Sequence, residues 1–127
     1  MEKVCFKTKK GPAALGPYST ATICGGVIYL SGMIGVNPQT GKAPEGGTLA
    51  QAAQAFENIK TVLAELGADT GDVLKTTVYL TNMADFGEVN KLYAEVFGPD
   101  YPARTCVEVS ALPMGLSIEV ECIARAQ

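Results

Sequence analysis

The sequence predicts an α+β fold in which a mixed β-sheet carries two helices on one of its faces. Two observations lead to this prediction. Six short β-prone runs surround two longer segments in which apolar residues recur at helical spacing. Each helical segment joins one strand to the next, and strand–helix–strand connections of this length imply parallel crossovers.

Length and composition fit one packed domain over residues 1–127. Hydrophobic residues make up 47% of the chain and charged residues 18%, which is typical of a globule and not of a disordered segment. No apolar run approaches the roughly 20 residues of a membrane-spanning helix, and the N-terminus lacks the apolar stretch of a secretory signal. We therefore expect a cytoplasmic protein without a membrane partner.

The predicted strands cover residues 3–7, 20–24, 27–31, 73–81, 103–109 and 116–124. Gly25 and Gly26 lie between the second and third of these runs, and two glycines at this spacing predict a two-residue hairpin turn. Residues 37–47 are dense in turn formers and are expected to form a surface loop.

The two helices are marked by apolar stripes and by their ends. The stripes are Leu49, Ala52, Ala53, Phe56, Ile59, Leu63 and Leu66 in the first, and Val89, Leu92, Tyr93, Val96 and Phe97 in the second. Thr48 with Gln51 has the pattern of a capping box, and Gly67 suits the C-terminal end of that helix. Asp85 is expected to cap the second helix and Gly98 to end it.

The two faces of the sheet differ in composition. The set expected beneath the helices is Ile28, Leu30, Leu74, Val78, Leu80, Val107, Val109, Ile118, Val120 and Cys122. The opposite set is Tyr29, Ser31, Thr77, Tyr79, Arg104, Cys106, Glu108, Glu119, Glu121 and Ile123. This second face is too apolar to be fully wet and has no cover from the same chain. We therefore predict a symmetric oligomer with pockets between subunits.

The chain has no histidine. Ser–His and Cys–His nucleophile pairs, histidine metal sites and histidine acid–base pairs are thereby excluded. The net charge of −3 and the scattered basic residues argue against a nucleic-acid partner, which requires a basic face. The four cysteines form no C-x-x-C pair and are expected to be free thiols of a reducing cytosol.

Arg104 and Cys106 are two residues apart on one strand and share a face, and Glu119 on the last strand is assigned to the same side. The guanidinium cannot deprotonate, so on a half-buried face it needs an anionic partner. That partner is either a protein carboxylate in an oligomer interface (Glu119, Glu121 or Glu108) or the carboxylate of a ligand, which the guanidinium matches bidentately. The charge pattern alone favours a protein carboxylate.

The other candidates are weaker when taken singly. A buried cysteine such as Cys106 is usually a small apolar residue, and no histidine can activate it, although Arg104 would lower its pKa somewhat. Tyr18 follows a Gly-Pro turn, where tyrosines pack more often than they react. Glu119 and Glu121 at strand spacing fit either paired carboxylates or a solvated edge.

Longer segments resemble the reactive intermediate deaminase family (RidA, also called YjgF). They are GPYS at 16–19, SGMIGVNPQTG at 31–41, AAQAFENIKTVLAELG at 52–67, DVLKTTVYLTNMADFGEVNKLYAEVF at 72–97, YPARTCVEVSALP at 101–113 and IEVECIA at 118–124. They span nearly the whole chain. The combination of PAR-x-C with a following LP and IE-x-E is far more specific than any single residue.

The resemblance implies a chorismate-mutase-like fold assembled as a homotrimer, with a cleft between each pair of neighbouring subunits. It implies a 2-iminobutanoate/2-iminopropanoate deaminase, which hydrolyses enamines and imines such as 2-aminoacrylate to 2-keto acids and ammonia. It implies no metal and no cofactor. The substrate is a small carboxylate released by pyridoxal-phosphate dehydratases.

By the same resemblance, Arg104 binds the substrate carboxylate, Cys106 lines the pocket near the reacting carbon, and Glu119 positions or activates the attacking water. The remaining site residues implied by the resemblance are Tyr18, Ser31 and Asn90. The chain departs from the family pattern at Met33, Gly35 and Thr20, where many relatives have Gln, Pro and Gln. These departures are expected to remove polar groups near the pocket mouth and to affect substrate range.

Two other functions are kept beside the deaminase. One is a non-catalytic trimer that uses the same Arg104 pocket to bind keto acids or other small carboxylates. The other is the ribonuclease or translation-inhibitor activity attributed to some relatives, which the negative charge and the lack of histidine oppose.

Overall fold

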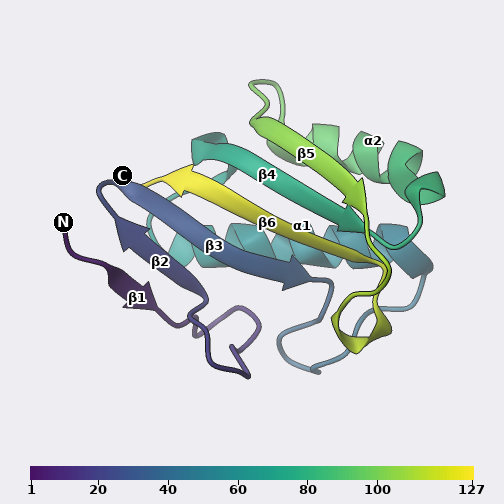
Figure 1. Cartoon of the computed structure of the whole chain (residues 1–127), viewed down its shortest axis with the longest axis horizontal. Coiled ribbons are helices and arrows are strands. Elements are labelled where there is room, and N and C mark those ends of the chain that lie inside the picture. Colours follow the sequence, from purple (N-terminus) through teal and green to yellow (C-terminus); the bar gives the residue numbers. More distant parts are fainter.

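The computed structural model describes residues 1–127 and contains one six-stranded sheet of order β1-β2-β3-β6-β4-β5. The strands are β1 (Val4–Phe6), β2 (Ala21–Cys24), β3 (Val27–Ile34), β4 (Val73–Leu80), β5 (Ala103–Glu108) and β6 (Ile118–Arg125). The helices are α1 (Gly47–Glu65) and α2 (Phe86–Phe97), with the short 3-10 turns η1 (Thr70–Asp72), η2 (Met83–Asp85) and η3 (Pro113–Gly115). Both helices lie behind the sheet in Figure 1, which confirms the predicted α+β class.

The sheet is mixed. Strands β3 and β4 each pair antiparallel with β6, so they run parallel to one another and are joined by α1. Strands β4 and β5 pair directly in parallel and are joined by α2. Both predicted parallel crossovers are therefore confirmed. The predicted hairpin is also present, because Gly25 and Gly26 have φ of 58° and 78°, the signs that a type I′ turn requires.

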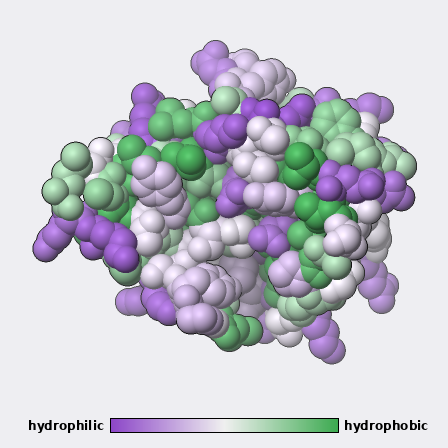
Figure 2. All heavy atoms as spheres, in the orientation of Figure 1, coloured by the Kyte–Doolittle hydropathy of each residue, from purple (hydrophilic) through white to green (hydrophobic).

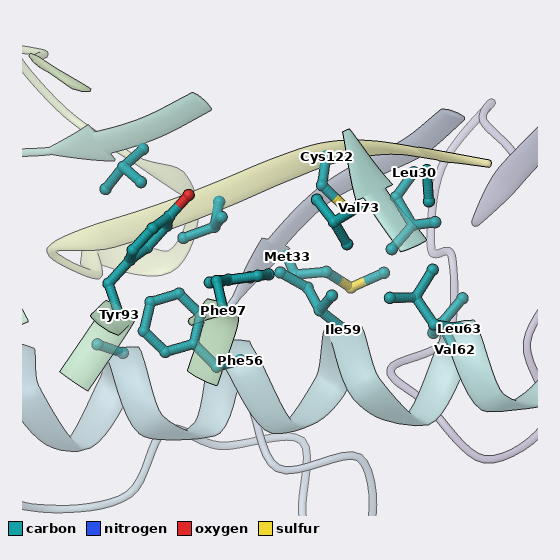
Figure 3. Close-up of a cluster of buried hydrophobic side chains, with 14 of the residues drawn as sticks. Leu30, Met33, Phe56, Ile59, Val62, Leu63, Val73, Tyr93, Phe97 and Cys122 are labelled. Atoms are coloured by element: carbon teal, nitrogen blue, oxygen red, sulfur yellow. The ribbon is translucent and has the colours of Figure 1, made fainter. Parts of the chain in front are cut away.

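The core lies between the sheet and the helices (Figure 3). The predicted α1 stripe supplies Phe56, Ile59 and Leu63, whose side chains are at most 1% exposed. Phe56 makes edge-on contacts with two aromatic rings of α2, Tyr93 at 6.0 Å and Phe97 at 5.6 Å between ring centroids. These contacts fix the position of α2 against α1, and α2 in turn lies beside the edge strand β5 (Figure 1).

The polar residues at the helix starts act differently from the prediction. Gly46, with φ of 117°, is the N-cap of α1, whereas Thr48 lies inside the helix. The Thr48 hydroxyl donates to Asp85 Oδ2 at 2.8 Å and lies 2.7 Å from Ser117 Oγ. Asp85 does occupy the N-cap position of α2, but its side chain makes no capping bond. The predicted capping box at Thr48 is therefore wrong, since this side chain links the two helix starts to the segment before β6.

The predicted division of the sheet into two faces is wrong in two places. Leu74 is 50% exposed, because a bulge between Val73 and Lys75 changes the alternation at the start of β4. Val107, also predicted beneath the helices, is 38% exposed. In β5 it is Cys106 that pairs with the buried Val78, so the alternation of this edge strand is opposite to the predicted one.

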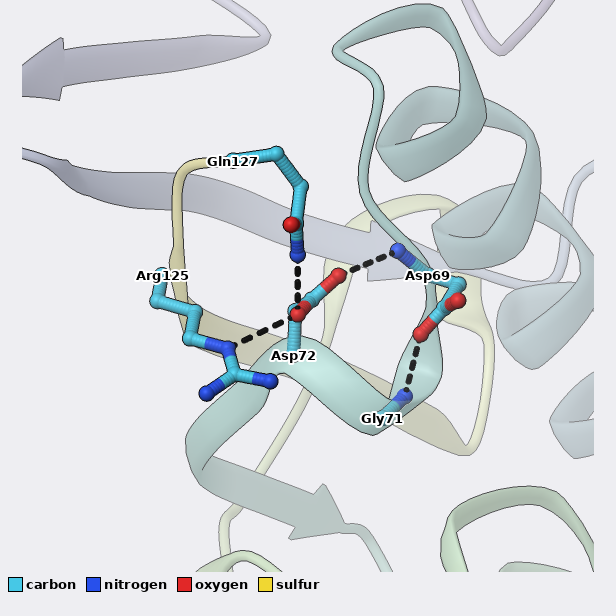
Figure 4. Close-up of polar contacts among 5 residues, drawn as sticks. All are labelled: Asp69, Gly71, Asp72, Arg125 and Gln127. Atoms are coloured by element: carbon cyan, nitrogen blue, oxygen red, sulfur yellow. Dashed lines mark hydrogen bonds and ion pairs between the residues drawn. The ribbon is translucent and has the colours of Figure 1, made fainter.

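The C-terminal end of β6 is attached to η1 (Figure 4). Asp72 Oδ1 accepts hydrogen bonds from Arg125 Nε at 2.8 Å and Gln127 Nε2 at 2.5 Å, and Asp72 Oδ2 accepts one from the Asp69 backbone N–H at 3.0 Å. These bonds lower the pKa of the Asp72 carboxyl, and the one from Arg125 has the largest effect.

The sheet face opposite the helices has no cover within the chain, as predicted. Figure 2 shows apolar and polar residues interleaved over this face. Tyr29 is 47% exposed there and Val107 lies on the same side. Neither helix combines the length and the apolar character needed to cross a membrane.

Candidate active site

A cleft of about 400 Å³ lies where three loops meet the C-terminal end of β3. Tyr18 comes from the first loop, Pro38 from the second and Met114 from the third, and Ser31 and Gly32 form the wall on β3. Figure 1 shows these three loops at the bottom of the view, beyond the end of β3. The structure thus brings together two of the predicted substrate-binding residues, Tyr18 and Ser31.

The positions of Tyr18 and Ser31 follow from local backbone contacts. The Ser31 hydroxyl donates to the Ser19 carbonyl at 2.7 Å, and the Ser31 N–H donates to the Thr20 carbonyl at 2.9 Å. The Tyr18 N–H donates to the Gly16 carbonyl at 2.9 Å and closes the Gly-Pro turn, which leaves the phenol half exposed. The side chain is therefore held at the rim of the cleft and not packed into the core.

Glu119 lies against the same wall. Its carboxylate presses on Gly32, where an added Cβ would lie 1.9 Å from Oε2, so only glycine fits there. Burial raises the pKa of the Glu119 carboxyl, and the negative charge of Glu121 raises it further. A carboxyl beside a cleft whose pKa is raised is suited to take and return protons.

Glu121 and Tyr79 belong to the same face. The sequence suggested Glu121 only as a partner of Arg104 or as one of a pair with Glu119, and it suggested no role for Tyr79. The Tyr79 hydroxyl donates to Glu121 Oε1 at 2.5 Å, and Tyr79 pairs with Glu119 across the two strands. The hydrogen bond to Glu121 raises the pKa of Tyr79, so the phenol stays protonated. The strand spacing of Glu119 and Glu121 was the only signal of this arrangement.

Arg104 lies elsewhere, on the edge strand β5 and on the side of α2. Its Nη1 donates to Asn90 Oδ1 at 2.6 Å, and its guanidinium carbon lies 4.7 Å from the Tyr93 ring centroid and 5.2 Å from that of Phe86. The side chain is exposed. It forms no ion pair in this chain, whose one ion pair joins Arg125 to Asp72.

The sequence of α2 explains why these three residues contact Arg104. Phe86, Asn90 and Tyr93 are spaced by four and three residues and therefore lie on one face of the helix, toward β5. The Tyr93 hydroxyl lies 2.7 Å from Thr76 Oγ1 inside the core, which anchors the ring under the guanidinium. Sequence reasoning placed Asn90 near the site but missed the support from Phe86 and Tyr93, although their spacing was visible.

Cys106 lies two residues beyond Arg104 on the same side of β5 and packs partly against the core. Burial raises the pKa of the Cys106 thiol, and the nearby Arg104 only partly opposes this effect. Arg104 therefore lowers the pKa of the thiol as expected, but burial has the larger effect and the net direction is upward. Cys106 is a thiol that can line a pocket and is not an activated nucleophile.

The predicted site residues thus form two groups in one chain. Tyr18, Ser31 and Glu119 lie at the cleft, on the uncovered side of the sheet. Arg104, Cys106 and Asn90 lie on the helix side, at β5. Ser31 on β3 is three strand spacings, or ~14 Å, from β5, and Glu119 on β6 is two strand spacings, or ~10 Å, from β5 and on the opposite face. The prediction that Arg104 and Cys106 share the face of Glu119 is therefore wrong.

The three departures from the family pattern have structural roles. Met33 is 4% exposed and belongs to the core (Figure 3), and Thr20 is 2% exposed and accepts a hydrogen bond from the Thr8 backbone. An added Cβ at Gly35 would lie 2.3 Å from the Gln51 carbonyl oxygen, so α1 packs directly on this glycine. Thr20 and Met33 line the cleft, whereas Gly35 does not, and the effect of the three positions on substrate range stays a prediction. No group of three or more Cys, Asp or Glu side chains is arranged to hold a metal ion.

Comparison with known proteins agrees with this fold. The family model described as Endoribonuclease L-PSP matches residues 8–126. The mouse 2-iminobutanoate/2-iminopropanoate deaminase is 44% identical over 119 residues, which cover 94% of this chain and 88% of the mouse protein. A RutC family protein of Pyrococcus abyssi is 44% identical over 124 residues, 98% of each chain.

A solved structure gives the same result in three dimensions. The crystal structure of RidA from the Antarctic bacterium Psychrobacter sp. PAMC 21119 superposes with a TM-score of 0.91 at 41% identity, covering 96% of this chain and 98% of that one. The fold and these matches define a protein of the α+β class that carries a YjgF-like sheet. The chain belongs to the RidA/YjgF/L-PSP family.

Proposed function

We propose that this protein is a deaminase that hydrolyses reactive imines and their enamine tautomers to 2-keto acids and ammonia. The observation that carries the proposal is the state of Arg104. Its guanidinium is exposed, held in place by Asn90 and two aromatic rings, and has no carboxylate partner in the chain. A fixed arginine without a partner is suited to bind the carboxylate of a small ligand.

The proposed site is completed by a second subunit. Arg104 and Glu119 are too far apart, and on opposite faces, to act on one small molecule within a chain. The uncovered sheet face, with Tyr29 and Val107 exposed, supplies an apolar surface for association with copies of the same chain. In a homotrimer, β5 of one subunit would lie next to the cleft of its neighbour, and each of three clefts would receive one Arg104.

The reaction follows from these groups. Arg104 binds the substrate carboxylate and so fixes the imine carbon near Glu119. Glu119 takes a proton from water, the water oxygen adds to the imine carbon, and the nitrogen is protonated to give a carbinolamine. Glu119, which has passed the water proton to the nitrogen, then takes the hydroxyl proton of the carbinolamine and transfers it to the amino group, so that the C–N bond breaks and ammonia leaves as the keto group forms. Positioning and general-base catalysis are each worth a few orders of magnitude in rate.

A coupled assay tests the proposal. Serine or threonine dehydratase generates the imine, and the release of keto acid is followed with and without this protein. We expect faster release with the parent chain and no acceleration with Arg104→Ala, whereas Lys60→Ala, which removes an exposed cation from α1, behaves as the parent. Equal rates with and without the parent protein would contradict a deaminase.

The two alternatives predict other results in the same experiments. A carboxylate-binding trimer would bind keto acids in an Arg104-dependent way without accelerating the release of keto acid. A ribonuclease, the activity that the family is named for, would cleave RNA in a way that Glu119→Gln or Arg104→Ala abolishes. The absence of histidine and the net charge of −3 favour the imine over RNA as substrate. A cytoplasmic location stays a prediction from the free cysteines.

A further inference from the structure

We infer that the Thr48 hydroxyl positions both groups of candidate site residues, because it links the start of α2, which supports Arg104, to the start of β6, which carries Glu119. This inference rests on the proposed deaminase function and adds a residue to it. Thr48 makes no hydrogen bond to Arg104 or Glu119 and acts through Asp85 and Ser117. It is therefore a positioning residue and not a catalytic one.

The Thr48 cluster consists of Thr48, Gln51, Asp85 and Ser117, whose side chains meet at the first turn of α1. The Thr48 hydroxyl donates to Asp85 Oδ2 at 2.8 Å, and its oxygen lies 2.7 Å from Ser117 Oγ. A hydroxyl has a single proton, so Thr48 is the acceptor in the second of these bonds. Gln51 Oε1 accepts from the Ser117 backbone N–H at 2.8 Å and lies 3.1 Å from Ser117 Oγ. One turn of α1 therefore holds two other segments of the chain.

The link to Arg104 runs through the start of α2. Asp85 occupies the N-cap position, where an Asp side chain usually accepts from its own helix, but its carboxylate makes no capping bond and is bonded to Thr48 instead. The next residue is Phe86, whose ring centroid lies 5.2 Å from the guanidinium carbon of Arg104. The aromatic contact of Tyr93 with α1 lies two turns further along the helix. The Thr48 cluster therefore holds the end of α2 that carries Phe86.

The link to Glu119 runs through the segment before β6. Ser117 directly precedes β6, and Glu119 is the second residue of that strand. The Glu119 carboxylate lies so close to β3 that a Cβ added at Gly32 would be 1.9 Å from Oε2. The same turn of α1 also contacts the end of β3, because a Cβ at Gly35 would be 2.3 Å from the Gln51 carbonyl oxygen. A shift of the α1 turn would therefore move Glu119 relative to β3.

The two links predict two different kinetic effects. Arg104 binds the substrate carboxylate, so displacement of α2 raises KM, whereas Glu119 acts on the attacking water, so displacement of β6 lowers kcat. A misplacement of about 1 Å can cost about 100-fold in rate, so small shifts are measurable. In the proposed trimer, Arg104 and Glu119 of one chain belong to different clefts, and each Thr48 therefore acts on two clefts.

Three variants separate the links. Asp85→Ala breaks the link to α2, and we expect KM to rise about three- to tenfold with kcat within about twofold of the parent. Ser117→Ala breaks the hydroxyl bond to Thr48, and we expect kcat to fall by about the same factor at the parent KM. Thr48→Val keeps the shape of the side chain, breaks both links and shows both changes. Thr48→Ser keeps the hydroxyl and restores the parent values.

The measurement uses an L-amino-acid oxidase that generates the imine from leucine at a set rate, and semicarbazide traps the imine that the protein has not hydrolysed. The dependence of hydrolysis on the rate of imine supply gives kcat and KM. Thr61→Val is the control, because it makes the same substitution about 20 Å further along α1, and it keeps the parent constants.

A purely structural role of the cluster would only reduce the amount of folded enzyme, so that kcat falls in the variants and KM changes in none. That result, parent constants in Thr48→Val, or a Thr48→Ser variant as impaired as Thr48→Val would overturn the inference and leave the deaminase function standing. If Thr48→Val does not fold, Asp85→Ala and Ser117→Ala decide. Loss of folding in all three would assign the cluster to stability alone and overturn the inference. No acceleration of imine hydrolysis by the parent would contradict the deaminase function itself.

Discussion

At the scale of single residues, Arg104 and Glu119 lie in opposite kinds of surroundings. The guanidinium is exposed, stacked on aromatic rings and bonded to the Asn90 amide. The carboxylate is partly buried against Gly32 and faces the charge of Glu121. The first group is suited to bind an anion, and the second is suited to exchange protons. This division of roles leads to two predictions.

The first prediction concerns the pH dependence of hydrolysis. The base form of Glu119 is the deprotonated one, so kcat/KM falls as the pH drops through its raised pKa. Glu121→Gln removes a negative charge that raises this pKa, so the acid limb of the profile moves to lower pH. Glu119→Gln reduces activity by about 10²- to 10⁴-fold at a pH above this pKa, and the difference from the parent narrows in acid, where the parent carboxylate is protonated. Glu57→Gln, on the exposed side of α1, leaves the midpoint of the limb in place, and a limb that Glu121→Gln fails to move would contradict Glu119 as the base.

The second prediction concerns the guanidinium geometry of Arg104, as distinct from its positive charge. Arg104→Lys keeps the charge but loses the bidentate geometry and the stacking on Tyr93 and Phe86. We expect KM to rise and kcat/KM to fall by about 10- to 100-fold, the value of one hydrogen bond to a charged group. Steady-state kinetics of Arg104→Lys beside the parent measure this. Parent kinetics with lysine would show that only a positive charge is needed and that the geometry described for Arg104 has no role.

At the scale of secondary structure, α1 is held against the sheet by a close backbone contact at Gly35. A Cβ at this position would lie 2.3 Å from the Gln51 carbonyl oxygen. Gly35→Ala therefore forces α1 away from β3, and we expect a loss of about 1–3 kcal/mol in the free energy of unfolding. Gly87→Ala is the matched control, because no atom lies within 4 Å of the added Cβ in α2. Denaturant titration compares the two, and equal stabilities would contradict the contact.

The attachment of β6 to η1 gives a stability prediction that depends on pH. The pKa of Asp72 is lowered in the folded chain, chiefly by Arg125, so the bond contributes stability above the unfolded pKa of the carboxyl. That contribution is lost as the pH falls through the lowered folded pKa. Arg125→Ala is expected to be less stable than the parent at pH 7 and to match it in strong acid. A difference that persists in acid would assign the effect to packing and not to charge.

Most of the elements could be predicted because their signals are local. Phe56, Ile59 and Leu63 carry a helical period that no strand would show, and two glycines at the hairpin permit one turn type. Which residues of β5 face the helices could not be predicted. Ala103–Glu108 has polar residues at both its odd and its even positions, and it lies at a sheet edge that α2 covers only in part. The bulge at Leu74 has no sequence signal of its own, since it is set by pairing with β6.

The residues of the candidate site stay a prediction from the family resemblance, whereas their arrangement in the chain differs from the predicted one. The family resemblance indicated six site residues: Arg104, Cys106, Glu119, Tyr18, Ser31 and Asn90. Alternation along a strand cannot tell which of two faces an edge residue occupies. The division of the site between β5 and the cleft therefore required the three-dimensional register.

At the scale of the whole molecule, the chain has two separate groups of candidate site residues, which we propose are half-sites, and one uncovered sheet face. Neither half-site contains both a carboxylate-binding cation and a candidate base. Association that covers the sheet face can bring the Arg104 half of one subunit to the Glu119 half of the next. Because each chain then contributes to two different clefts, the two halves can be inactivated separately in different chains.

The central claim, a site shared between subunits, is tested by combining two inactive variants. Arg104→Ala and Glu119→Gln chains are produced together with different affinity tags, and oligomers that carry both tags are purified. In a mixed trimer of either composition, one of the three clefts has both halves intact, so we predict about one third of the parent activity from two chains that are each inactive alone. Mixed oligomers that are as inactive as the separate variants would contradict a site built from two subunits.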